Sequence, residues 1–181
     1  LKLIGLQSFE HSPSISIYQD RERSVGAITF GQRYASTSDE GESVLRAEYG
    51  WSTTGGDWQI AVEGAYNFLD VTAAYSELTA NGIYSPLPLP GADTFVDEWR
   101  AETTVTRGWR ITPQLTLQTM AGFEFSRIRQ ASAGGLSRRF WRPKGTAALS
   151  WIASPRLTVN ASVAREVGQL SFYDFSSAVD L

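Results

Sequence analysis

The feature that most constrains this chain is a period-two alternation of apolar and polar side chains, repeated in segments that turn-forming residues separate. Successive side chains of a strand point to opposite faces, so each segment predicts a strand with one apolar and one polar face. The clearest segments are residues 44–53, 58–68, 95–109, 115–125, 141–151 and 157–167, and weaker ones are 1–9, 14–18 and 25–34. The pattern predicts an all-β, antiparallel fold of about eight strands.

The connections between these segments alternate in length. Short turns are predicted near residues 11–13, at Gly55-Gly56, and near residues 111–113 and 154–156. Longer polar or Gly/Pro-rich loops are predicted at residues 35–43, 78–94 and 130–138. Short turns at one rim and long loops at the other are typical of a transmembrane β-barrel of the outer membrane.

Aromatic spacing favours lipid over a soluble core. Three aromatic pairs lie ten residues apart on one face of a predicted strand: Trp99 and Trp109, Trp141 and Trp151, and Trp58 and Phe68. Ten residues of a tilted strand rise roughly 26 Å along a barrel axis, which matches an apolar band about 25 Å tall with aromatic residues at both edges. We therefore predict that these tryptophan side chains point away from the lumen.

The opposite faces of the same strands are too charged for a dry core. A turn centred on Thr112 would set Trp99 beside Phe125 and Arg100 beside Glu124. Such a cation–carboxylate pair suits a wet or plugged lumen.

A turn centred on Pro155 would likewise set Trp151 beside Val159 and Lys144 beside Glu166. Two features oppose the scheme. A turn at Gly55-Gly56 would place Glu48 opposite Glu63, a like-charge pair unless Arg46 or Arg100 lies close, and Arg165 falls on the lipid-facing side.

Composition narrows the function classes. The chain has 181 residues, is 42% hydrophobic and carries a formal charge of −3, so it suggests neither a disordered chain nor a nucleic-acid-binding one. It contains no cysteine, no Gly-x-Ser-x-Gly motif and a single histidine, His11. We therefore expect no enzyme activity, no cofactor and no metal site, with His11 a solvated turn residue.

Two predicted loops and the polar face supply the candidate ligand-binding residues. Asp39, Glu40 and Glu42 form an acidic segment that would attract a cationic or metal-bearing ligand. Alternating prolines enforce extended geometry in the second loop, where Tyr84, Leu87 and Leu89 are the candidates. Arg100 and Glu124 are the candidates on the polar face.

The two ends of the chain predict a segment of a larger barrel. Residues 170–181 lack the clean alternation of a closing strand, and the chain begins directly in an apolar segment. We expect residues 1–181 to form part of one β-barrel domain whose plug and signal peptide lie outside this sequence.

Three stretches resemble barrel strands of TonB-dependent-receptor-like proteins. They are LKLIGLQSFEHS at residues 1–12, DEGESVLRAEYGW at 39–51, and the stretch running from WRPKG at 141–145 to VGQLSFYDF at 167–175. The resemblance implies an outer-membrane receptor with a barrel of about 22 strands closed by a plug. It also implies import of siderophores or other scarce nutrients with inner-membrane energy through the TonB system.

Under this hypothesis the partners are outer-membrane lipid, the plug of the parent chain, the TonB system and a small nutrient ligand, with no nucleic acid. Two alternatives remain open. One is a complete small barrel with a structural or adhesive role. The other is a soluble all-β module that binds carbohydrate on its tryptophans.

Overall fold

The structure is a computed structural model that describes residues 1–23, 26, 28–131 and 135–168. The described chain forms β-strands joined by turns and loops, which confirms the all-β prediction. The strands are Lys2–Arg21 (β1), Ile28–Thr53 (β2), Gly56–Leu78 (β3), Tyr84–Leu87 (β4), Asp93–Thr112 (β5), Leu115–Ala131 (β6), Ser137–Ser154 (β7) and Leu157–Arg165 (β8). Within those residues, no helix is long and apolar enough to cross a membrane.

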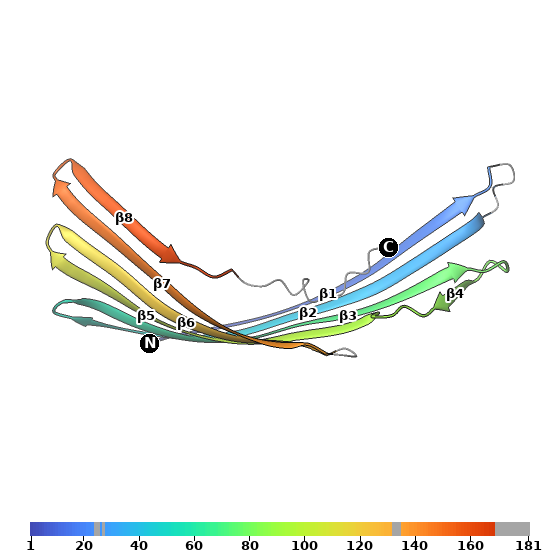
Figure 1. Cartoon of the computed structure of the whole chain (residues 1–181), viewed down its shortest axis with the longest axis horizontal. Coiled ribbons are helices and arrows are strands. Elements are labelled where there is room, and N and C mark those ends of the chain that lie inside the picture. Colours follow the sequence, from blue (N-terminus) through green and yellow to red (C-terminus); the bar gives the residue numbers. More distant parts are fainter. Residues whose placement is uncertain (24–25, 27, 132–134, 169–181) are drawn as a thin grey trace.

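All strands belong to one antiparallel sheet that curls into an open half-barrel (Figure 1). The order is β1-β2-β3-β5-β6-β7-β8, and β4 pairs with the end of β3 beyond β5. Each long strand neighbours the next long strand in sequence, as in an up-and-down meander. Within the described residues β1 pairs only with β2 and β8 only with β7, so both edges of the arc are open.

Two predicted connections are wrong, because the strands run through them. Residues 11–13 lie inside β1, where Pro13 pairs with Thr37. Within the described sheet β1 pairs on one side only, and proline is most common on such edge strands. Residues 35–43 lie inside β2, a strand of 26 residues.

The three short turns predicted between later strands are confirmed, although two of them are displaced by a residue or two. Thr53 pairs with Gly56, so the first turn consists of residues 54 and 55 rather than 55 and 56. Gly56 has a φ of 143°, and a Cβ there would collide with the carbonyl oxygen of Gly108. Only glycine therefore allows β3 and β5 to approach this closely at the turn.

The turns step along the sheet by a constant amount. Gly56 at the start of β3 pairs with Trp109, three residues before β5 ends at Thr112. Leu115 at the start of β6 pairs with Trp151, again three residues before β7 ends at Ser154. Three residues are about 10 Å along a strand, and successive turns are two strand spacings of about 4.8 Å apart. If the turns lie at the same height along a barrel axis, the strands must therefore tilt by about 45° from that axis, close to the tilt of transmembrane barrels.

The predicted register between β5 and β6 is wrong by two residues. Arg100 pairs with Ser126 instead of Glu124, and Trp99 pairs with Arg127 instead of Phe125. The cause is a turn placed at residues 113 and 114, together with a bulge between Arg110 and Thr112. A register shift of two residues keeps each side chain on the same face of the sheet, so the predicted polar and apolar faces remain correct.

The predicted register between β7 and β8 is confirmed where both strands are regular. Trp151 pairs with Val159 as expected. Glu166 lies just beyond the end of β8 at Arg165, so no ladder pair with Lys144 forms. The Leu170–Leu181 segment, on which the fragment prediction partly rests, lies outside the described residues.

Candidate functional site

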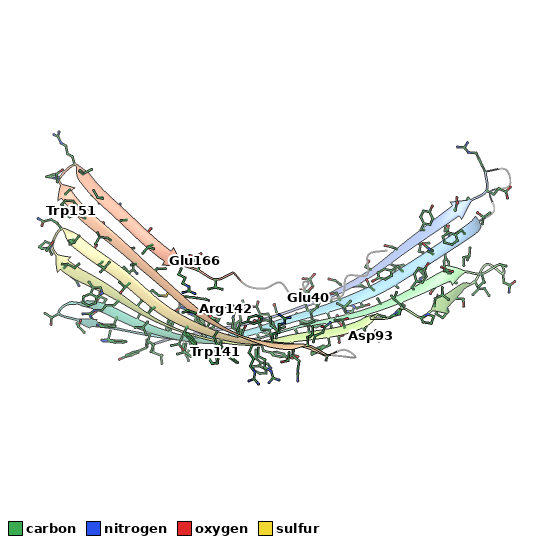
Figure 2. The ribbon with its side chains drawn as sticks, in the orientation of Figure 1. Glu40, Asp93, Trp141, Arg142, Trp151 and Glu166 are labelled. Atoms are coloured by element: carbon green, nitrogen blue, oxygen red, sulfur yellow. The ribbon has the colours of Figure 1, made fainter. Side chains whose placement is uncertain are left out.

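The concave face carries a row of five charged side chains at one level of the sheet. Cross-strand pairing joins Arg46 on β2 to Glu63 on β3, Glu63 to Glu102 on β5, Glu102 to Glu124 on β6, and Glu124 to Arg142 on β7. Paired residues share a face, and Figure 2 shows Arg142 and Glu40 on the concave side and Trp141 on the convex side. Three adjacent glutamates would repel one another strongly without nearby cations.

Glu63 receives two cations. Arg46 Nη1 donates to one carboxylate oxygen of Glu63 at 3.2 Å, and Arg100 Nη2 donates to the other at 3.2 Å. Arg46 also donates through Nε to Glu48 at 2.7 Å. The predicted Glu48–Glu63 opposition is therefore wrong, because the displaced turn brings Arg46 opposite Glu63 and leaves Glu48 opposite Ala61.

Lys144 joins the other two glutamates. Its Nζ lies 2.8 Å from Glu102 Oε2 and 2.5 Å from Glu124 Oε2, although Glu102 is two strands away. Lys144 pairs with Gly122 on the strand between them, where no side chain blocks its path. Arg142 Nη1 lies 2.7 Å from Glu124, whose side chain is only 1% exposed. The network thus joins four glutamates to Arg46, Arg100, Arg142 and Lys144, and Lys2 adds a fifth cation with its Nζ 3.9 Å from Glu48.

A small apolar patch lies beside the network on the same face, toward the long-loop end. Leu69, Val96 and Ile128 are almost fully buried, with 1%, 0% and 3% of their surface exposed. Three buried polar atoms in this region, Asn67 Oδ1, Arg100 Nε and Ser126 Oγ, have no hydrogen-bond partner within the described part of the chain.

The convex face has an aromatic row near the short turns, which we call the lower girdle. Its aromatic members are Tyr49, Trp51, Trp58, Trp109 and Trp151, and Arg107 lies among them. Trp51 and Trp58 stack in parallel with their ring centroids 5.9 Å apart. The Arg107 guanidinium lies 4.4 Å from the ring centroid of Trp58 and 3.2 Å from that of Trp109. Two cation–π contacts thus hold this arginine against the tryptophans.

A second aromatic row crosses the same face toward the long loops, and we call it the upper girdle. Its members are Phe9, Tyr66, Phe68, Trp99, Phe125 and Trp141. Tyr66 and Trp99 approach to 4.7 Å between ring centroids, and Phe125 and Trp141 to 4.5 Å. Phe68 lies directly over Gly41, so any side chain at residue 41 would displace the ring.

The convex surface between the girdles is apolar. On β2 to β7 its side chains are Leu45, Ala47, Ile60, Val62, Ala101, Thr103, Val105, Leu117, Thr119, Ala121, Phe123, Pro143, Ala147 and Leu149, with glycines at 64 and 145. Trp99 and Trp141 are 59% and 64% exposed, so they do not pack in a shared protein core. On β8, Arg165 interrupts this surface opposite Gly145.

The acidic residues predicted in a loop lie in β2 instead and divide between the faces. Asp39 is on the convex face, where its Oδ1 lies 2.5 Å from Nδ1 of His11. Glu40 and Glu42 are on the concave face. His11 is accordingly a strand residue paired with a carboxylate, not a turn residue. In the described chain, no group of three or more acidic, histidine or cysteine side chains could hold a metal ion.

The proline-containing segment divides in the same way. Tyr84 and Leu87 belong to β4, which pairs with β3, whereas Leu89 lies in the loop that follows. Tyr84 reaches across Gly31 on the convex face and accepts a hydrogen bond from Gln19 at 3.1 Å. Leu87 pairs with Tyr75 and faces the concave side. The structure therefore does not bring these three candidates together with Asp39.

Arg100 and Glu124 both belong to the charged network, but they bind different partners. Sequence reasoning missed Glu102 and Arg142 as members, although both lie on predicted polar faces. Their recognition required the register, since Glu102 and Glu124 become neighbours only after the two-residue shift. Near the short turns, the concave face also has a depression of about 420 Å³, whose lining includes Asp57, Arg110, Gln118 and Asn160.

Comparison with protein-family models and with curated proteins gave no match.

Proposed function

We propose that this chain is a wall segment of an outer-membrane β-barrel, with its convex face in lipid and its concave face toward a wet or plugged lumen. The observation that carries the proposal is the apolar convex band between two aromatic girdles. Trp99 and Trp109 mark its edges on β5, ten residues apart on one face. At a tilt of about 45° this spacing corresponds to about 24 Å, close to the height of the apolar band of such barrels.

The concave face supports the second half of the proposal. A row of three glutamates held by four cations is stable where water or a polar domain completes its hydrogen bonds, and costly in a dry interior. The unpartnered atoms of Asn67, Arg100 and Ser126 supply sites for such a complement. A plug domain or lumenal water would fill this role.

The parent protein, in this proposal, is a TonB-dependent receptor for a siderophore or another scarce nutrient. The open half-barrel supports a parent with more strands than the seven long ones described here. The receptor class itself rests on the resemblance of the three sequence stretches. The number of strands, the plug and the transported nutrient belong to the proposal.

Membrane fractionation of the full-length protein tests the membrane assignment. We expect the protein in the outer-membrane fraction, soluble only with detergent, and with a gel mobility that changes on boiling as the barrel unfolds. A protein that is monodisperse without detergent would refute the assignment and favour the soluble carbohydrate-binding alternative.

Crosslinking to the periplasmic domain of TonB then tests the receptor class. We expect a specific crosslink for a receptor. An outer-membrane protein that forms no such crosslink and whose barrel closes with β1 against β8 would be the small structural barrel.

A further inference from the structure

A second charged row lies on the convex face, at the upper girdle. Cross-strand pairing joins Tyr66 on β3 to Trp99 on β5, Trp99 to Arg127 on β6, and Arg127 to Arg139 on β7. Both arginines are exposed and face outward with the tryptophans. Two cations therefore sit side by side at the edge of the apolar band.

The two arginines have no neutralising partners like those of the paired glutamates on the concave face. Arg127 has only a long contact from its Nε to Ser137 Oγ at 3.5 Å, and neither arginine has a carboxylate partner in the described chain. The neighbouring Arg129 differs, because it binds Asp97 through Nε at 2.8 Å and through Nη2 at 3.3 Å. Like charges directly opposite one another destabilise a sheet, so this pair calls for an external anion.

The surface next to the pair on the band side is apolar and aromatic. The adjacent row toward the short turns holds Phe125 and Trp141, whose ring centroids are 4.5 Å apart. Phe123 follows, with its ring centroid 5.3 Å from that of Trp141. An anion held by the two guanidinium groups would thus have hydrocarbon-binding rings on one side and polar surface on the other.

We propose that Arg127 and Arg139 bind the phosphate headgroup of a membrane lipid, whose acyl chains lie along Trp141, Phe125 and Phe123. Guanidinium groups bind phosphate through paired, charge-assisted hydrogen bonds. An amphiphile fits this surface better than a free anion because charge and apolar rings are adjacent. The inference rests on the proposed membrane orientation, which places this rim, with its long connections, in the outer leaflet.

Native mass spectrometry of the full-length protein in detergent tests this site. The probe is lipid A carrying both phosphates, compared with lipid A from which the phosphates have been removed. We expect the phosphorylated lipid to bind at least about tenfold more tightly. The double variant Arg127→Gln/Arg139→Gln should lose this preference, whereas Arg127→Lys/Arg139→Lys should retain most of it.

Arg138→Gln is the matched control, since Arg138 is exposed on the same strand but faces the concave side. Its affinity should stay within about twofold of the unmodified protein. A change in gel mobility on boiling equal to that of the unmodified protein would show that each variant keeps its barrel.

Three results would overturn the inference while leaving the membrane assignment intact. They are equal binding of the two lipids, full retention of the preference in the glutamine double variant, and complete displacement of lipid by an equal concentration of inorganic phosphate. A protein that needs no detergent would instead defeat the proposed function itself.

Discussion

The concave and convex faces of this sheet handle charge in opposite ways, although their side chains alternate along the same strands. On the concave face, Glu63, Glu102 and Glu124 lie in one row and each has at least one cation within 3.2 Å. On the convex face, charge is excluded from the band of β2 to β7, and Arg107 at its lower edge binds aromatic rings. Adjacent residues of one strand therefore lie on opposite faces, one with paired ions and one without charged side chains. The difference indicates two environments of different polarity, one for each face.

The strongest test of this contrast breaks the buried ion pair. Arg142→Met removes the guanidinium beside Glu124, leaving that buried carboxylate with Lys144 alone. We expect the free energy of unfolding to fall by about 3 kcal/mol, because a buried charge loses a partner. Denaturant unfolding of the full-length protein in lipid vesicles measures this loss.

Arg138→Met is the control for that test, since Arg138 shares the strand and the face but is exposed. Its effect should stay below about 0.5 kcal/mol. Equal losses for the two variants would mean that the row contributes nothing specific.

A new charge on each face compares the two environments directly. Ala121→Arg places a cation at the middle of the convex band, and Ala148→Arg places one at a similar height on the concave face. We expect the first to cost about 2–4 kcal/mol in vesicles, as for an arginine at mid-bilayer, and the second far less. If both variants lost the same stability, the convex face would not contact lipid.

A substitution at Gly122, where the Lys144 side chain crosses β6, should give a smaller loss of stability. A Cβ on Gly122 would lie 3.0 Å from Thr104 Cγ2 and 3.6 Å from Lys144 Cβ. Gly122→Ala should therefore destabilise the fold by about 1 kcal/mol through crowding. Gly64→Ala is the matched control, because nothing lies within 4 Å of a Cβ there. A stability gain at both positions would show that Gly122 is not needed for the crossing.

The smallest expected effect concerns the lower girdle. Arg107→Gln keeps a polar side chain but removes the charge between Trp58 and Trp109, which should cost about 0.5–1 kcal/mol. Arg107→Lys should lose less, because the cation remains. Tryptophan fluorescence during unfolding measures both variants. A loss as large in the lysine variant as in the glutamine variant would contradict a cation–π role.

The faces of the strands and three of the four short turns were predictable here because they depend on local patterns. Leu45 and Tyr49 alternate with Arg46 and Glu48, and this alternation survives any even shift in pairing. The true extent of β2 was not predictable, because near Asp39 both faces carry small or charged residues and the period-two signal disappears. Where both faces of a strand are polar, its sequence resembles that of a loop.

The charged network was only partly predictable for a different reason. The sequence places Arg100, Glu102 and Glu124 on the polar face, but which of them are neighbours depends on the exact turn residues. Two turns are displaced by a residue or two from their predicted positions. As a result, Glu63 lies opposite Arg46 instead of Glu48, and Glu102 lies opposite Glu124. Local chemistry at turns therefore decides long-range ion pairing.

The length of β2 has a consequence for how a molecule would approach the proposed barrel from outside. The part of this strand beyond Gly41, which lies under the upper girdle, begins at Ile28 and contains 13 residues. At a tilt of about 45° it stands roughly 30 Å above the edge of the band. In the proposed barrel, β1 to β3 would therefore continue as a hydrogen-bonded sheet beyond the band, whereas β5, β6 and β7 end closer to the upper girdle. A molecule approaching that side of the proposed barrel would meet this extended sheet before it reached the lipid.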